Sequence, residues 1–149
     1  MKARDYLDRL EMLDTVISNK LIEREQWREI ALSVTAHSDD VRVQTSGSKD
    51  KMANALARCV DMEREIDGLI DKLVDLKKDV CSVIEQLSVD EYDVLHKLYI
   101  QRLSFDEVAA AKNRSKSWVT TIHGRALQNV QAILNEREKE NGTETNGQN

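Results

Sequence analysis

Apolar residues recur at heptad spacing, without a break, between Met52 and Leu87. Such a stripe predicts one long helix that packs against another helix, because an isolated helix cannot stably expose this much apolar surface to water. The seam residues are Met52, Cys59, Ile66, Leu73, Val80 and Leu87 at one heptad position and Ala55, Met62, Leu69, Leu76 and Val83 at the other.

The segment from residue 2 to residue 36 also places apolar side chains at helical spacing, and it is the obvious packing partner. Between the two segments, residues 37–49 are rich in Ser, Asp, Thr and Gly, which predicts a connecting loop. We therefore expect residues 1–87 to form an antiparallel helical hairpin, a coiled-coil-like arm. The apolar positions of the first segment are Tyr6, Leu7, Leu10, Leu13, Ile17, Leu21, Trp27, Ala31 and Val34.

A parallel homodimer through the long helix is the alternative to the hairpin. In that arrangement Lys72 and Lys77 would face each other as like charges, whereas Arg58 and Glu63 would attract each other. The charge pattern leaves both arrangements open. It also leaves open a dimer of hairpins over a second stripe, which is only partly apolar.

Three helix starts follow in the last third of the chain. Ser88 with Glu91, and Ser104 with Glu107, both fit the capping box and predict helices that begin near residues 89 and 105. Ser115 is a third N-cap candidate, so the middle helix has about eight residues. A short helix, a three-residue turn and a longer amphipathic helix are the parts of a helix-turn-helix. The apolar face of the last helix comprises Val119, Ile122, Ala126, Val130 and Ile133.

The stretch from Leu103 to Leu127 resembles the second half of region 4 of bacterial sigma-70 family factors. The family pattern is Leu-Ser/Thr-Leu-x-Glu-Ile-Ala, a Gly turn and Ser-x-x-x-Val-x-x-Ile-x-x-Arg-Ala-Leu, and the match extends over about residues 87–134. The resemblance implies a helix-turn-helix DNA-binding domain over residues 88–137. The matching residues are Glu107, Val108, Ala109, Ser115, Val119, Ile122, Arg125, Ala126 and Leu127.

A second resemblance concerns the whole chain. An acidic helical arm with a Val-Gln-Thr-Ser loop, Val43 to Ser46, is similar to small phage-encoded regulators that carry a sigma-like domain at their C-terminus.

Two departures from the sigma pattern affect the backbone. Asn113 replaces the turn Gly and also tolerates a positive φ, whereas Arg102 stands where the family often has another Gly.

Residues on the outer face of the last helix are the candidates for reading DNA. Lys116, Ser117, Thr120 and Thr121 lie near its start, where base edges are contacted in the major groove, and they replace the Arg and Glu residues of the family. We therefore expect a different DNA sequence to be read. The expected phosphate contacts are Lys112, Arg114, Ser115, Arg125 and Trp118, although packing at the edge of the core is an equal alternative for Trp118.

Composition predicts an all-α protein, since the chain has no Pro, five Gly and 33 % charged residues. The net charge is −5, but residues 104–137 carry five basic and three acidic side chains, a balance of +2. The excess of acidic residues therefore lies in the rest of the chain. Because few phosphates would be neutralised, non-specific affinity for DNA should be modest. Residues 138–149 contain no apolar side chain and are expected to be a disordered tail.

Other classes of function find little support in the residues. Two cysteines, Cys59 and Cys81, fit neither a disulfide framework nor a metal spacing, which favours a reducing cytoplasm. The histidines, His37, His96 and His123, stand apart, and no phosphate loop or nucleophile elbow occurs. No apolar run is long enough for a membrane span. We therefore expect that the protein is not an enzyme, binds no cofactor and is not attached to a membrane.

The resemblance implies a sequence-specific transcription regulator of a phage or prophage, which binds double-stranded DNA and contacts RNA polymerase. Residues 1–86 contain only Tyr6 and Trp27 as aromatics, so we do not expect the promoter-melting region of a complete sigma factor. One alternative is a protein-interaction module that binds polymerase or a sigma factor without DNA. Another is a small DNA-packaging (terminase) subunit. Whether the arm is only a scaffold or holds a partner stays open.

Overall fold

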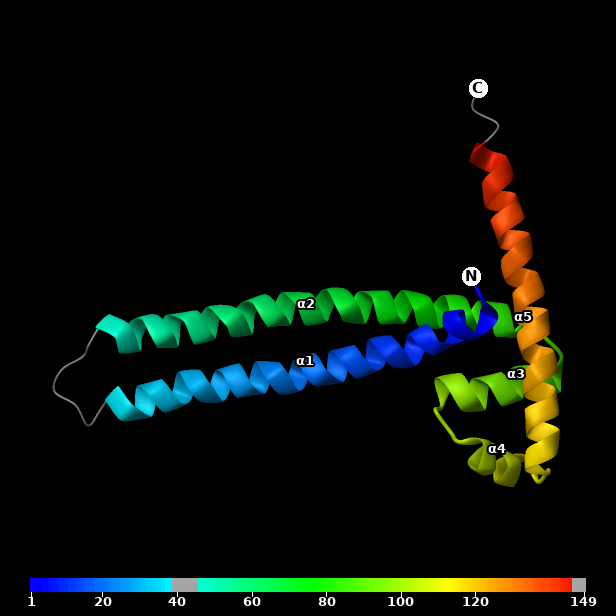
Figure 1. Ribbon diagram of the computed structural model, residues 1–149, viewed down its shortest axis with the longest axis horizontal. Coiled ribbons are helices and arrows are strands. Elements are labelled where there is room, and N and C mark those ends of the chain that lie inside the picture. The colour runs from blue at the N-terminus through cyan, green and yellow to red at the C-terminus, as the bar shows by residue number, and fades with distance from the viewer. Residues whose placement is uncertain (39–45, 146–149) are drawn as a thin grey trace. The chain divides into compact units, whose positions relative to one another are not determined.

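The computed structural model describes residues 1–38 and 46–145, without the side chains of residues 34–38, 46, 48 and 145 (Figure 1). Within these ranges the protein is all-α, as composition predicts. Of the predicted loop 37–49, residues 37–38 and 46–49 are helical, and residues 39–45 lie outside the described residues. The elements are α1 (Ala3–Ser38), α2 (Ser46–Ile84), α3 (Val89–Leu95), the π-helix η1 (His96–Ile100), α4 (Phe105–Lys112) and α5 (Lys116–Thr145).

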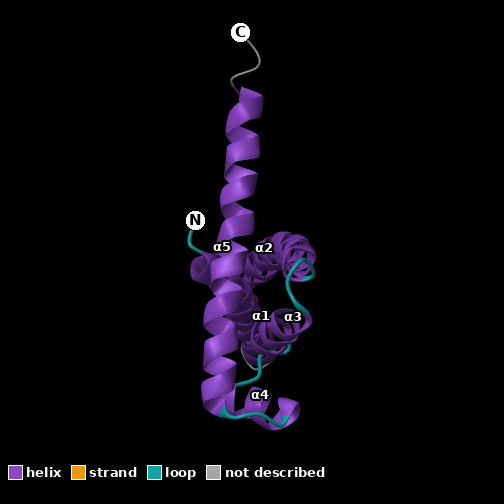
Figure 2. Ribbon diagram, turned by 90° about the vertical axis from the view of Figure 1, so that its right-hand side faces the viewer, coloured by secondary structure: helices purple, strands orange, loops and turns teal. Residues whose placement is uncertain are grey.

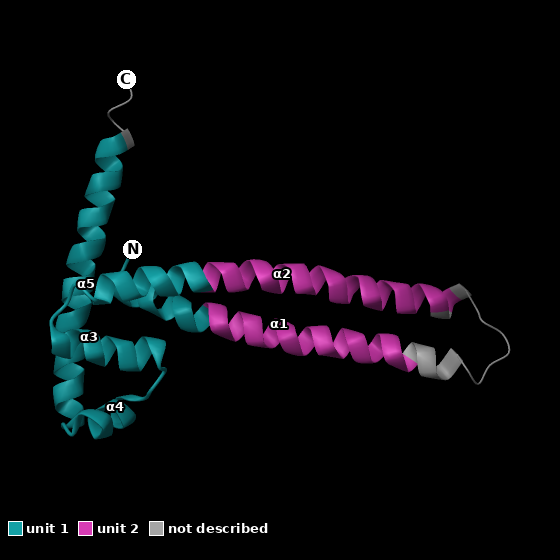
Figure 3. Ribbon diagram, turned by 180° about the vertical axis from the view of Figure 1, so that it is seen from behind, with its two compact units in different colours: residues 1–12, 74–149 teal, residues 13–73 magenta. Residues whose placement is uncertain are grey.

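The chain divides into two compact units (Figure 3). Unit 1 consists of residues 1–12 and 74–149, and unit 2 consists of residues 13–73. This division differs from the boundary expected at residue 87, because the first turns of α1 and the last turns of α2 belong to the same unit as α3, α4 and α5.

Unit 2 contains two antiparallel stretches of α1 and α2. Lys20 Nζ lies 2.8 Å from Glu65 Oε2, and the Cys59 thiol lies 3.7 Å from the backbone carbonyl of Arg24. Residue numbers rise along one helix as they fall along the other, so the two stretches run in opposite directions. The hydrogen bond from Lys20 holds the pKa of the Glu65 carboxyl below its ordinary value. The buried apolar residues of this unit are Ile17, Ala31, Ala55, Cys59, Met62 and Ile66.

Unit 1 is built around α5, and Figure 2 shows α3 and α4 beside the N-terminal part of this helix. Many of its apolar side chains are completely buried, with Leu7, Leu95, Val108, Val119 and Val130 all at 0 % exposure. A helix packed by several neighbours can bury a broad apolar face, and most of the predicted face of α5 is buried. Ile133 is the exception, since it is half-buried and the adjacent Leu134 is buried in its place. The rest of the fully buried set comprises Val80, Val83, Ile84, Val94 and Ala126.

Polar contacts hold the first turns of α1 within unit 1. The Tyr6 hydroxyl donates to Asp79, and Arg137 Nη1 donates to both carboxylate oxygens of Asp79 at 3.0 Å. Burial, together with the hydrogen bond to Asp79, raises the pKa of Tyr6 above its ordinary value. The backbone N–H of Ala3 donates to Gln131 Oε1 at 2.7 Å. These contacts join α1 to α2 and α5, and no local sequence pattern predicts them.

The C-terminal part of α5 corrects one expectation. Residues 138–145 are helical, although they contain no apolar side chain and disorder was expected from Glu138 onward. The N-terminal ammonium of Met1 lies 3.0 Å from Glu138 Oε1, and the Thr143 hydroxyl donates to the carbonyl of Lys139 at 2.8 Å. A long helix already anchored in a core continues more readily than a new one starts, because nucleation is the unfavourable step. Residues 146–149 lie outside the described residues.

Candidate nucleic-acid interface

Helix α4 begins and ends with the local chemistry that the sequence predicts. Glu107 N–H donates to Ser104 Oγ at 3.1 Å, and Ser104 N–H donates to the Glu107 carboxylate at 3.3 Å, which completes the capping box. Asn113 follows the helix in the left-handed conformation, with φ 53° and ψ 47°. Arg102 also has a positive φ, 61°. Both positions therefore adopt the backbone that glycine favours, and Asn113 turns the chain from α4 toward α5.

Helix α5 starts at its predicted cap and is held by a small apolar cluster. The backbone N–H of Trp118 donates to Ser115 Oγ at 3.1 Å. The Trp118 ring is half-buried and packs against this cluster. The cluster fixes which face of α5 points inward. Its buried members are Val94, Val108, Ala109, Val119 and Ile122, and Leu98, Leu103, Phe105 and Trp118 pack against it.

The opposite face of α5 is exposed. Lys116, Ser117, Thr120 and Thr121, the four expected base-reading residues, are all exposed to solvent. The exposed face continues through Gly124, where an added Cβ would meet no atom within 4 Å. One side of the first turns of α5 is thus exposed to solvent, while the other side is fixed in the core.

The two threonine hydroxyls make the same local hydrogen bond. Thr120 Oγ1 donates to the Lys116 carbonyl and Thr121 Oγ1 donates to the Ser117 carbonyl, each at 3.0 Å. With its proton used in this way, each hydroxyl oxygen keeps its acceptor capacity, and the methyl group is available for apolar contact. An acceptor oxygen and a methyl group suit, respectively, a base amine and the thymine methyl in the major groove.

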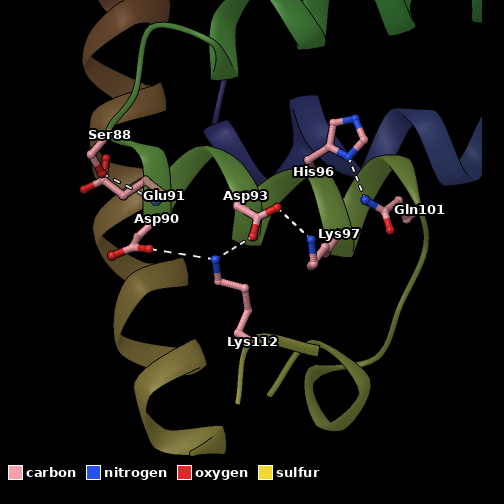
Figure 4. A network of polar contacts seen from close by, with 8 residues as sticks. All are labelled: Ser88, Asp90, Glu91, Asp93, His96, Lys97, Gln101 and Lys112. Carbon is pink, nitrogen blue, oxygen red and sulfur yellow. Dashed lines mark hydrogen bonds and ion pairs between the residues drawn. The ribbon is translucent and has the colours of Figure 1, made fainter. Parts of the chain in front are cut away.

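Lys112, an expected phosphate contact, is already engaged in a network at the junction of α3 and α4 (Figure 4). Its Nζ lies 2.6 Å from Asp93 Oδ2 and 3.9 Å from Asp90 Oδ1, and Lys97 Nζ lies 2.7 Å from Asp93 Oδ1. Burial raises the pKa of the Asp93 carboxyl, but the two lysines together outweigh it and hold this pKa below its ordinary value. Lys112 therefore ties α4 to α3 in this structure.

The other expected phosphate contacts lie at the surface. The Arg114 guanidinium stands 5.2 Å from the centroid of the Trp118 ring, a cation–π contact. Arg125 is exposed, and its guanidinium makes no ion pair or hydrogen bond with the part of the chain that the structure describes. The Ser115 hydroxyl is used as the helix cap. The available positive charge beside the exposed face of α5 therefore comes from Arg114, Lys116 and Arg125.

Two buried polar residues, Glu91 and His123, and their hydrogen-bond partners were missed by sequence reasoning. Glu91, only 8 % exposed, accepts two hydrogen bonds of 3.0 Å from Asn129. Its carboxylate is engaged by Asn129, and of the predicted capping box only the bond from Glu91 N–H to Ser88 Oγ, at 3.4 Å, is formed. A carboxylate three residues after a serine is ambiguous, because it fits a cap and a tertiary contact equally well.

The second pair is His123 with Tyr99. His123 Nε2 lies 2.8 Å from the Tyr99 hydroxyl, and the Phe105 ring meets the imidazole edge-on, with 5.2 Å between centroids. Burial lowers the pKa of His123, and the nearby charge of Arg4 lowers it further. Burial also raises the pKa of Tyr99 to about 12. The position of His123 next to Ile122, on the apolar face of α5, was the available signal for this burial.

Comparisons with protein-family models, with curated proteins and with solved structures found no match to this chain. Within residues 1–38 and 46–145, no group of three or more His, Cys, Asp or Glu side chains is placed to hold a metal ion. None of the helices described is both long and apolar enough to cross a membrane.

Proposed function

We propose that this protein is a sequence-specific DNA-binding transcription regulator, in which α4, the turn at Asn113 and α5 act as a helix-turn-helix. The first turns of α5 enter the major groove, which accommodates one α-helix. The observation that carries the proposal is the exposed face formed by Lys116, Ser117, Thr120 and Thr121 on a helix whose other face is buried.

Each part of this surface has a physical role in the proposal. Lys116 donates to guanine O6 or N7, and Thr120 and Thr121 contact a base amine or a thymine methyl. Arg114 and Arg125 contact phosphates and position the domain without reading sequence. As the resemblance to small phage-encoded regulators with a sigma-like domain implies, the regulator is encoded by a phage or prophage and contacts RNA polymerase.

A salt titration of duplex binding tests the proposal. With labelled duplexes from the regions upstream of genes in the same genome, the affinity should fall as salt rises, because phosphate contacts release counterions. The double variant Lys116→Ala/Thr120→Ala should bind its preferred duplex at least about tenfold more weakly, because each lost base contact contributes on the order of 1 kcal/mol or more.

The same helix offers a closely matched control. Lys139 and Thr143 have the same spacing, are exposed and share the same hydrogen bond from the threonine hydroxyl to the lysine carbonyl. Lys139→Ala/Thr143→Ala should bind like the wild type. Equal losses in the two double variants, or binding that ignores salt, contradict the proposal. Co-purification with polymerase in the absence of any duplex binding would support the protein-interaction alternative.

A further inference from the structure

A carboxylate stands beside the lysine that is proposed to read a base. Asp106, in the first turn of α4, has its Oδ1 3.4 Å from the Nζ of Lys116, in the first turn of α5. Both side chains are largely exposed, Asp106 at 77 % and Lys116 at 64 %. The two groups belong to different helices, so the turn at Asn113 is what brings them together.

This placement is electrostatically unfavourable for contact with an arbitrary stretch of DNA. A carboxylate at the edge of a groove-facing surface is repelled by phosphates, whatever the base sequence. Lys116 can neutralise a phosphate only by leaving Asp106, and the carboxylate then loses its partner in a region of negative potential. Acidic charge at this point therefore weakens binding to every duplex on which Lys116 is used only as a phosphate contact.

A base contact by Lys116 has no such conflict. An ammonium group carries three donors and no acceptor, so one donor can stay on Asp106 while others reach guanine O6 and N7. The ion pair also limits the directions in which the flexible lysine side chain points. The carboxylate therefore penalises the phosphate contact more than the base contact.

We propose that Asp106 is a specificity-determining residue, which keeps Lys116 from phosphates and presents it to a guanine edge. This inference rests on the proposed function, since it assigns a role at the same surface. Specificity is a difference between affinities, and it increases when binding to the wrong sequences is weakened. Asp106 raises specificity in this way, because it weakens binding to duplexes on which Lys116 contacts only a phosphate.

The experiment compares two duplexes, one of mixed sequence and one enriched by the wild-type protein from a random pool. Asp106→Asn should bind the mixed-sequence duplex about two- to fivefold more tightly, the range for an exposed ion pair. Its affinity for the enriched duplex should change less, so the ratio of the two affinities falls. The slope of log affinity against log salt on the mixed duplex should steepen by about 0.9, which corresponds to one additional phosphate contact.

Two controls separate this role from charge and from helix stability. Asp90→Asn makes the same substitution in the first turn of α3, where Lys112 keeps its contact with Asp93. Glu136→Gln removes the partner of Lys139, an ion pair of 3.6 Å with similarly exposed side chains. Both should raise mixed-duplex affinity less than Asp106→Asn does, and circular dichroism melts should show all three variants folded.

The double variant Asp106→Asn/Lys116→Ala completes the test. In the Lys116→Ala background, Asp106→Asn should have no more effect than Asp90→Asn. A gain that persists without Lys116, or that equals the gain of the controls, overturns the role of Asp106 and leaves DNA binding by the wild type intact. Failure of every variant to bind any duplex at low salt overturns the proposed function as well. Binding by Asp106→Asn without any binding by the wild type also overturns both, because the wild type then has no sequence to prefer.

Discussion

Units 1 and 2 use the same kind of helix but bury it to different extents. In unit 1, the first half of α5 has α3 and α4 as neighbours, and most apolar residues that face them are buried. In unit 2, the stretches of α1 and α2 share one seam, and many large apolar side chains remain exposed. These exposed residues are Leu21, Ile22, Trp27, Ile30, Leu32, Leu56, Val60 and Ile70.

The difference shows what a third packing element adds. Two helices can cover only one stripe of each other, whereas a helix with several neighbours can bury a broad face and satisfy polar groups inside it. The buried polar residues Glu91 and His123 accordingly lie in unit 1, while the pair Lys20 with Glu65 of unit 2 lies largely at the surface. Unit 1 thus has the rigid framework that a reading surface requires.

The largest expected effect comes from opening the core of unit 1. Leu95→Ala should lower the free energy of unfolding by about 3 kcal/mol, because the side chain is fully buried and its removal leaves a cavity. Leu56→Ala in unit 2 should change it by less than about 0.5 kcal/mol, because Leu56 is 47 % exposed.

The chain's two tryptophans report the two units separately, since Trp118 lies in unit 1 and Trp27 in unit 2. Urea unfolding followed by fluorescence therefore measures Leu95→Ala in unit 1 through Trp118, in a Trp27→Phe background, and Leu56→Ala in unit 2 through Trp27, in a Trp118→Phe background. Similar losses for Leu95→Ala and Leu56→Ala would contradict the contrast between a closed core and a single seam.

An intermediate effect is expected when a buried carboxylate loses its partner. Asn129→Ala should lower the free energy of unfolding of unit 1 by about 2 kcal/mol, because both hydrogen bonds to the charged, buried Glu91 are lost. The exposed neighbour Gln128 provides the control Gln128→Ala. Lys20→Ala in unit 2 should have a smaller effect, since water replaces the lysine at the exposed Glu65. If Asn129→Ala lowers the free energy of unfolding no more than Gln128→Ala does, the Glu91–Asn129 pair does not contribute to the stability of unit 1.

The smallest effect concerns pH. The pKa of His123 is lower in the folded protein than in the unfolded chain, so the unfolded chain binds more protons and stability falls as the pH drops below about 6.5. His123→Gln should flatten this loss between about pH 7 and pH 5, and it can keep a hydrogen bond to Tyr99. Denaturation midpoints at several pH values measure the difference. An unchanged pH dependence in His123→Gln would show that the buried imidazole does not contribute.

The parts of the fold that sequence predicted are those with local signals. Ser104 with Glu107, and Ser115, mark helix starts through their own hydrogen bonds, and Asn113 adopts the positive φ that its turn requires. The buried face of α5 follows from the spacing of Val119, Ile122, Ala126 and Val130. Exposure of the four expected base-reading residues follows from the same periodicity, because the opposite side of an amphipathic helix faces solvent.

The parts that sequence did not predict depend on contacts between residues far apart in the chain. Tyr6, Asp79 and Arg137 meet only after three helices have packed, and nothing near Tyr6 indicates it. Lys112 has the charge of a phosphate contact, but two aspartates of α3 hold it. Charge and spacing identify candidate residues, whereas tertiary packing decides which of them remain available.

Selection of bound duplexes from a random-sequence pool tests the DNA-reading surface most directly, since it asks whether α5 prefers one base sequence. The wild type should enrich a recurring site that contains guanine. Thr120→Ala/Thr121→Ala should enrich a site altered at one or two positions, because only the contacts at those bases are removed. A wild-type pool that stays random after repeated rounds at low salt, or an identical site for both proteins, would contradict the assignment of this face of α5 to reading DNA.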